Sequence, residues 1–190
     1  MVDGDYVSLE PYTEEGHFYC DVTGTGAGTA TIRATCDDDT YAEKEILVTS
    51  NTRITSVTFS DLYDQNTIVD GDEIDLDDNN IQIRFDKGSG GSAPQYYTNG
   101  FAVRLYAKST LTVHSANENV KTINSIKFYQ PSSSPGTNSM SSDVETLDWG
   151  NREWGNTTGE DVTSVTLTEG GTSGNVRFTG IEVTYTTNEE

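Results

Sequence analysis

Apolar and polar residues alternate along most of the chain. In residues 29–36, Ala, Ile, Ala and Cys alternate with Thr, Thr, Arg and Thr. This period of two gives a strand one apolar face and one polar face. No window much longer than about 10 residues has the period of a helix, and Gly, Asn, Ser and Pro interrupt the chain throughout. The pattern predicts an all-β protein built from antiparallel sheets.

The alternating pattern restarts after residue 51, which divides the chain into two segments. Residues 1–51 hold two extended runs around a Gly-rich turn and a later strand, a set that is only marginally stable alone. Residues 52–190 show a longer series of candidate strands separated by turn residues. These are residues 54–59, 71–76, 81–85, 101–107, 110–114, 123–129, 161–167, 175–179 and 181–186. We predict a jelly-roll-like β-sandwich in this second segment.

The first segment carries a short series of strand motifs. These are Val22-Thr23-Gly24, the run GTATIRA at residues 28–34, and Ile46-Leu47-Val48. The series resembles the second half of the group 2 bacterial immunoglobulin-like domains of intimin- and invasin-type surface proteins and phage tail proteins. The resemblance implies a partial immunoglobulin-like module in residues 1–51. Because the first half of such a module is absent, we expect neighbouring domains in a longer parent chain.

The two cysteines, Cys20 and Cys36, lie in this segment. If the chain turns back about Gly28, the two residues face each other across a hairpin. Directly opposed Cα atoms in a sheet lie about 4.5–5.5 Å apart, a distance that a disulfide tolerates. Two reduced thiols acting as small apolar side chains are the alternative, because one register slip would separate the pair.

The second segment has a distinctive run at residues 85–106, FDKGSGGSAPQYYTNGFAVRLY. With later motifs it resembles an accessory domain of surface proteins from gut Bacteroidales. The later motifs are Ile123, Ile126 and Phe128, then Trp154 and Gly155, and last Ile181, Val183 and Tyr185. The resemblance implies a surface-protein module and transfers no binding residue.

The charge balance excludes some partners. The chain has 31 Asp and Glu against 11 Lys and Arg, a net charge of −20. Such a field repels nucleic acid and anionic membrane surfaces. No apolar run approaches the roughly 20 residues that span a bilayer, so we expect no membrane insertion.

An acidic stretch in residues 70–80 supplies oxygen atoms of the kind that calcium binds. Its candidate ligands are Asp72, Asp75, Asp77 and Asp78. The stretch lacks the central Gly and closing Glu of an EF-hand loop, and a solvated acidic turn is the alternative interpretation.

Aromatic and arginine residues suggest a carbohydrate site. Aromatic rings stack on sugar faces, and Arg and Tyr hydrogen-bond sugar hydroxyls. The candidates are Tyr96, Tyr97, Arg104, Tyr106, Trp149 and Trp154. A purely structural role is the alternative for the first four, and closing the open end of the sandwich is an equal alternative for one Trp.

Catalysis has little support. Only His17 and His114 are available as neutral-pH bases, and the chain has no G-x-S-x-G or zinc motif. A glycoside-hydrolase pair hidden among the acids is a third hypothesis.

The amino terminus lacks the profile of a secretory signal, which suits a piece of a longer precursor or a phage virion protein. We predict a non-catalytic module for adhesion or glycan binding in an extracellular or bacterial cell-surface protein. The alternative is a structural spacer or a phage virion decoration protein.

Overall fold

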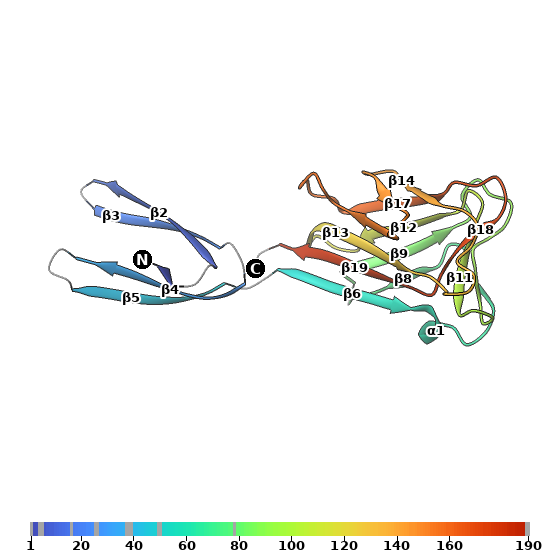
Figure 1. Cartoon of the computed structure of the whole chain (residues 1–190), viewed down its shortest axis with the longest axis horizontal. Coiled ribbons are helices and arrows are strands. Elements are labelled where there is room, and N and C mark those ends of the chain that lie inside the picture. Colours follow the sequence, from blue (N-terminus) through green and yellow to red (C-terminus); the bar gives the residue numbers. More distant parts are fainter. Residues whose placement is uncertain are drawn as a thin grey trace. The chain divides into compact units, whose positions relative to one another are not determined.

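The computed structural model describes residues 2–3, 6–15, 17–24, 27–36, 40–48, 51–77 and 79–188. It is 58% strand and 2% helix, with antiparallel sheets. The chain divides into two compact units, residues 1–51 and 52–190 (Figure 1). Among the described residues, no helix has the length and apolar content needed to cross a bilayer.

The first unit consists of two small sheets. Its strands are β1 (Val2–Asp3), β2 (Val7–Glu14), β3 (His17–Gly24), β4 (Gly28–Thr35) and β5 (Tyr41–Val48). β2 pairs with β3, and β4 lies between β1 and β5. β3 is exposed along its whole length, and the buried apolar residues among those described in this unit are Val7 and Ala30. The strands follow the sequence pattern, but the expected hairpin between β3 and β4 does not form.

The second unit begins with a strand of seven residues that is followed by a short helix. Its elements are β6 (Thr52–Thr58), α1 (Phe59–Leu62), β7 (Thr67–Ile68), β8 (Glu73–Asp75), β9 (Ile81–Asp86), β10 (Gln95–Tyr97), β11 (Ala102–Tyr106), β12 (Thr110–Ser115), β13 (Val120–Tyr129), β14 (Met140–Ser142), β15 (Leu147–Asp148), β16 (Glu153–Gly155), β17 (Ser164–Glu169), β18 (Asn175–Phe178) and β19 (Gly180–Thr187). They form a five-stranded sheet β14-β17-β12-β9-β8, a second five-stranded sheet β15-β16-β13-β19-β6, and a four-stranded sheet β18-β11-β10-β7.

The two five-stranded sheets enclose one hydrophobic core, whose layers can be followed in Figure 1. Ile83 and Leu167 enter it from one sheet, and Ile126 and Val183 from the other; all four are fully buried. Each such side chain contributes about 1.5–3 kcal/mol to the free energy of unfolding. Because one face of each sheet is apolar and the strands are antiparallel, the prediction of an all-β sandwich is confirmed.

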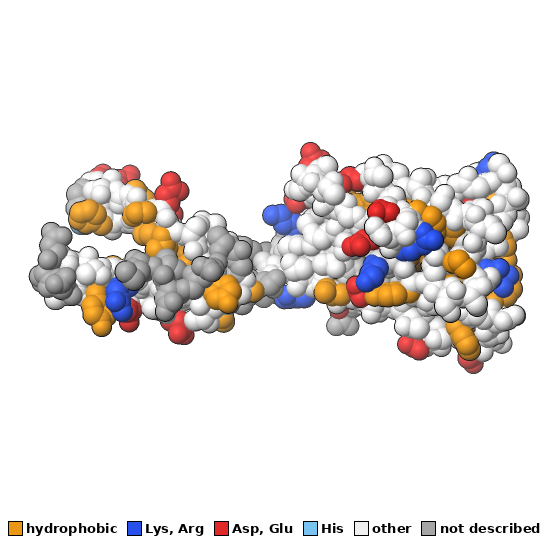
Figure 2. Space-filling view, in the orientation of Figure 1, with side chains coloured by type: hydrophobic (Ala, Val, Ile, Leu, Met, Phe, Trp, Pro, Cys, Tyr) orange, Lys and Arg blue, Asp and Glu red, His pale blue; other side chains and the backbone are white. Residues whose placement is uncertain are grey.

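Charged side chains of this unit do not gather in one acidic region on the face shown in Figure 2. Red and blue side chains lie scattered there among uncharged ones. The net charge of −20 is therefore a property of the whole chain and does not describe every part of its surface.

The loop at residues 131–139 is fastened to β18. The Arg177 N–H donates to the Pro135 carbonyl at 3.1 Å, and the Thr137 N–H donates to the Asn175 carbonyl at 3.0 Å. Between them, Gly136 has a φ of +99° and lies so close to β18 that a Cβ would be 2.4 Å from the Asn175 carbonyl oxygen. Only glycine fits this approach without strain.

Candidate functional site

The four-stranded sheet presents polar side chains on the face opposite its core contacts. Along β10, β11 and β18, Tyr96, Val103, Leu105, Val176 and Phe178 are buried in the core. Because successive strand residues point to opposite faces, the residues between them share the other side of the sheet. We call this set the polar sheet face; its members are Gln95, Tyr97, Arg104, Tyr106, Asn175 and Arg177, all of them half-buried.

The two tyrosines of the polar sheet face are joined by hydrogen bonds. The Tyr97 and Tyr106 hydroxyls lie 2.8 Å apart, and the Tyr97 hydroxyl is 2.9 Å from Gln95 Oε1, to which it donates. The bond with Tyr106, followed by burial, raises the pKa of Tyr97 above its ordinary value of 10.0. The hydrogen bonds therefore fix the position of the Tyr97 ring, and the raised pKa keeps its hydroxyl protonated at neutral pH.

Arg104 stacks on Tyr97 instead of pairing with a carboxylate. Its Cζ atom lies 4.0 Å from the centroid of the Tyr97 ring. Among the described residues, the ion pairs are Arg33–Glu43 and His114–Glu73, so Arg104 belongs to neither. A stacked guanidinium keeps its N–H donors at its edge, where they are free to bind another group.

Arg177 lies directly opposite Arg104 in the pairing of β11 with β18. Its Nε donates to Asn175 Oδ1 at 3.0 Å, and its Nη1 donates to Ser134 Oγ at 2.6 Å. Both partners are neutral. Two arginines thus occupy one cross-strand pair, a position where like charges destabilise a sheet.

Trp149 lies in a separate shallow groove of about 520 Å³. Its indole N–H donates to the Asn138 carbonyl at 3.2 Å, and its ring contacts those of Phe128 and Phe178. The Arg152 Cζ atom lies 4.6 Å from the Trp149 ring centroid. The half-buried ring is therefore partly used to close the core, as the structural alternative proposed.

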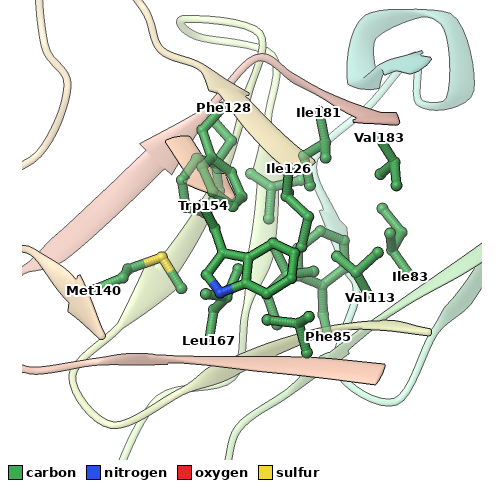
Figure 3. Packing of buried hydrophobic residues seen from close by; sticks show 14 of the residues in the cluster. Ile83, Phe85, Val113, Ile126, Phe128, Met140, Trp154, Leu167, Ile181 and Val183 are labelled. Atoms are coloured by element: carbon green, nitrogen blue, oxygen red, sulfur yellow. The ribbon is translucent and has the colours of Figure 1, made fainter. Parts of the chain in front are cut away.

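Trp154 and Tyr96 are core residues, which corrects the expectation that they meet a sugar. Trp154 is 0% exposed and lies among Met140, Leu167 and other apolar side chains (Figure 3). Its indole N–H donates to the Val144 carbonyl at 2.7 Å. Tyr96 is 1% exposed and packs against the ring of Tyr63 at 5.2 Å.

The acidic turn uses its carboxylates as hydrogen-bond acceptors. Asp75 Oδ1 accepts the N–H groups of Asp77 at 3.2 Å and Asn79 at 2.9 Å. Asp77 accepts a hydrogen bond from the Tyr185 hydroxyl. Asp72 lies beside Tyr63, where burial first and then this carboxylate raise the pKa of the Tyr63 hydroxyl.

These carboxylates do not converge on a common point. Within the described ranges, no group of three or more His, Cys, Asp or Glu side chains is placed to hold a metal ion. Asp72, Asp75 and Asp77 do not form such a group, and Asp78 lies outside the described residues, so the calcium site stays a prediction.

Cys20 and Cys36 are free and exposed, which agrees with the alternative of two reduced thiols, although these thiols are not buried. Cys20 on β3 lies opposite Pro11 on β2. Cys36 follows β4, which pairs with β1 and β5. The disulfide alternative depended on pairing between two strands that are adjacent in sequence, β3 and β4, and these strands have other partners.

The two histidines lie in different units. His17 belongs to β3, where its ring contacts that of Tyr19. His114 belongs to β12, and its Nε2 lies 2.9 Å from Glu73 Oε1. Each imidazole thus has a neighbour on its own sheet, and neither belongs to the polar sheet face.

Several residues around the candidate sites were missed by the sequence reasoning. Arg177 and Asn175 alternate with Val176 and Phe178, which identifies a strand but does not reveal that it pairs with β11. Glu169 is 1% exposed, and its carboxylate accepts hydrogen bonds from the Asn138 side chain and the Gly171 N–H. A buried acid in a sequence with so many exposed acids carries no distinguishing signal.

No family model matches this chain, and no curated protein or solved structure is significantly similar to it. The resemblance of the two segments to bacterial surface-protein domains therefore stays a prediction.

Proposed function

We propose that residues 52–190 form a non-catalytic module that binds carbohydrate through the polar sheet face, within a larger extracellular or bacterial cell-surface protein. The observation that carries this proposal is the gathering of Tyr97, Arg104 and Tyr106 on one side of the β10–β11 pair, beside Gln95. The sequence had suggested these three as ligand residues, and they lie together on a partly exposed surface.

The chemistry of the polar sheet face suits sugar hydroxyl groups. Its amide, hydroxyl and guanidinium groups donate and accept hydrogen bonds, while the tyrosine rings offer apolar surface for sugar C–H groups. The hydrogen bonds of Tyr97 to Gln95 and Tyr106 hold its ring in place before a ligand arrives. A site ordered in advance loses less entropy on binding.

A binding role fits this face better than hydrolysis does. Glycoside hydrolysis needs two carboxyl groups on either side of the scissile bond. The six residues of the polar sheet face include no Asp and no Glu.

A glycan-array assay of the full chain tests the proposal. We expect a defined set of glycans to bind, and Tyr97→Ala to weaken that binding by about tenfold or more, since it removes both the ring and its hydrogen bonds. The matched control is Tyr129→Ala, which removes a tyrosine from β13 in a five-stranded sheet. The Tyr129 hydroxyl donates to Glu182 at 3.0 Å.

Two results would contradict this function. One is the absence of binding to any glycan by a chain whose folding is confirmed by circular dichroism. The other is equal loss of binding in the two variants. The first outcome would favour the structural spacer or virion role, and the second would place glycan binding away from the polar sheet face.

A further inference from the structure

The cross-strand pair of Arg104 and Arg177 points to a specific class of glycan. We propose that the polar sheet face binds acidic carbohydrate, meaning a glycan that carries carboxylate or sulfate groups, with Arg104 as the principal contact to the anion. This inference rests on the proposed function and adds the charge of the ligand to it.

The first support is the placement of the two positive charges. The chain has 31 acidic residues, yet Arg104 and Arg177 lie opposite each other in the sheet. Neither belongs to an ion pair among the described residues. Like charges directly opposite each other destabilise a sheet. An anion bound between the two arginines would offset the repulsion between their charges.

The second support is the geometry of Arg104. Tyr97 covers a face of its guanidinium at 4.0 Å, and no hydrogen bond joins that guanidinium to another described residue. The planar edge of the group therefore keeps its pair of parallel N–H donors. Such an edge matches the two oxygens of a carboxylate or sulfate in a bidentate contact.

The third support is that Arg177, on the strand paired with that of Arg104, is held by neutral partners. Asn175 and Ser134 orient its guanidinium through Nε and Nη1. They do not neutralise its charge, and they leave Nη2 to donate to a ligand. Asn175 itself lies opposite Tyr106, another member of the polar sheet face that is neither acidic nor basic.

The net charge of −20 does not prevent this recognition. At physiological ionic strength, charges farther apart than about 8 Å are largely screened. The six residues of the polar sheet face contribute two arginines and no Asp or Glu, so the charge they bring to the face itself is positive.

Paired ligands that differ only in charge test the inference. We would measure binding of the full chain by calorimetry to oligogalacturonate and to its methyl ester, and to dextran sulfate and to unmodified dextran. We expect the charged member of at least one pair to bind about tenfold or more tightly than its neutral counterpart.

Arginine variants then locate the anion. Arg104→Gln should abolish the preference for the charged member, and Arg104→Lys should retain part of it because the charge remains without the bidentate edge. Arg177→Gln should weaken the preference. The matched control is Arg84→Gln, which removes an exposed arginine from β9 and should leave the preference intact.

The outcomes separate this inference from the proposed function. Equal binding of charged and neutral members would overturn the inference and leave glycan binding standing. A preference that survives in both Arg104→Gln and Arg177→Gln would place the anion elsewhere and also overturn it. Failure of the folded chain to bind any glycan on the array or in these pairs would contradict both.

Discussion

The hydroxyl of Tyr185 donates a hydrogen bond to the carboxylate of Asp77, and so joins the last strand of the second unit to its acidic turn. Burial first, and then Asp77, raise the pKa of Tyr185 from 10.0 to about 12. The ring is 1% exposed, so the hydroxyl cannot exchange this partner freely for water.

This contact predicts a loss of stability at high pH. Because the pKa of Tyr185 is higher in the folded protein, the folded state holds the proton more tightly than the unfolded chain does. The resulting stabilisation is complete below pH 10 and is lost as the pH rises from 10 toward 12. Urea denaturation of the wild type and of Tyr185→Phe between pH 8 and pH 12 measures this effect.

Tyr185→Phe should be less stable than the wild type at pH 8 by about 1 kcal/mol, through the lost hydrogen bond. The difference should shrink above pH 10. Absorbance titration supplies the control, because the variant should lack one tyrosine that ionises near pH 12. A constant difference across the pH range would argue against the raised pKa.

The two tryptophans should behave differently. Trp154→Ala should lower the free energy of unfolding by about 3–5 kcal/mol, because it leaves a large cavity in the core. Trp149→Ala should cost less, since its ring is only half-buried. Denaturant unfolding measures both values.

Fluorescence gives an independent measure of the same difference. In Trp149→Phe the remaining tryptophan is Trp154, whose emission should resist quenching by acrylamide because it is 0% exposed. In Trp154→Phe the emission should be quenched more readily. Strong quenching of Trp154 would show that it does not lie in the core.

Gly136 should be essential for fastening the loop to β18. A Cβ at this position would lie 2.4 Å from the Asn175 carbonyl oxygen, and the φ of +99° adds strain. Gly136→Ala should therefore lower stability by more than about 1 kcal/mol. Gly159→Ala is the matched control, since Gly159 also has a positive φ, +76°, but has open space around it. If the two variants lowered the melting temperature equally, the positive φ alone would account for the loss of stability and the close approach to β18 would not contribute.

Both cysteines should react with a thiol reagent in the folded protein without prior reduction. Cys20 and Cys36 are free and exposed, so we expect two thiols for each chain in an Ellman assay. Cys20→Ser and Cys36→Ser should each lose one. A wild-type chain that reacts only after reduction would instead support the disulfide.

The sequence predicted most long strands of the second unit because alternation over five or six residues is visible without knowing partners. The prediction at residues 110–114 corresponds to β12 (Thr110–Ser115), and that at 181–186 to β19 (Gly180–Thr187). The strands β14 (Met140–Ser142) and β16 (Glu153–Gly155) were missed, since three residues are too few to show a period.

The candidate site was predictable only in part. Alternation along one strand separates Tyr96 from Tyr97, because neighbouring residues point to opposite faces. It does not tell which strands pair, so Arg177 could not be placed beside Arg104. For the same reason the sequence left a disulfide and two reduced thiols open for Cys20 and Cys36, since register and partner depend on the assembled sheet.

The first and last strands of the second unit, β6 and β19, are antiparallel neighbours, with Thr52 opposite Thr186 (Figure 1). The unit's two ends thus emerge at one side of the sandwich. A pulling force that separates these two ends acts along the hydrogen bonds of the pair, because those bonds run perpendicular to the strands. The bonds would therefore break one after another, starting at the pair nearest the ends. Under tension β6 should therefore detach from β19 before the strands that carry the polar sheet face are disturbed.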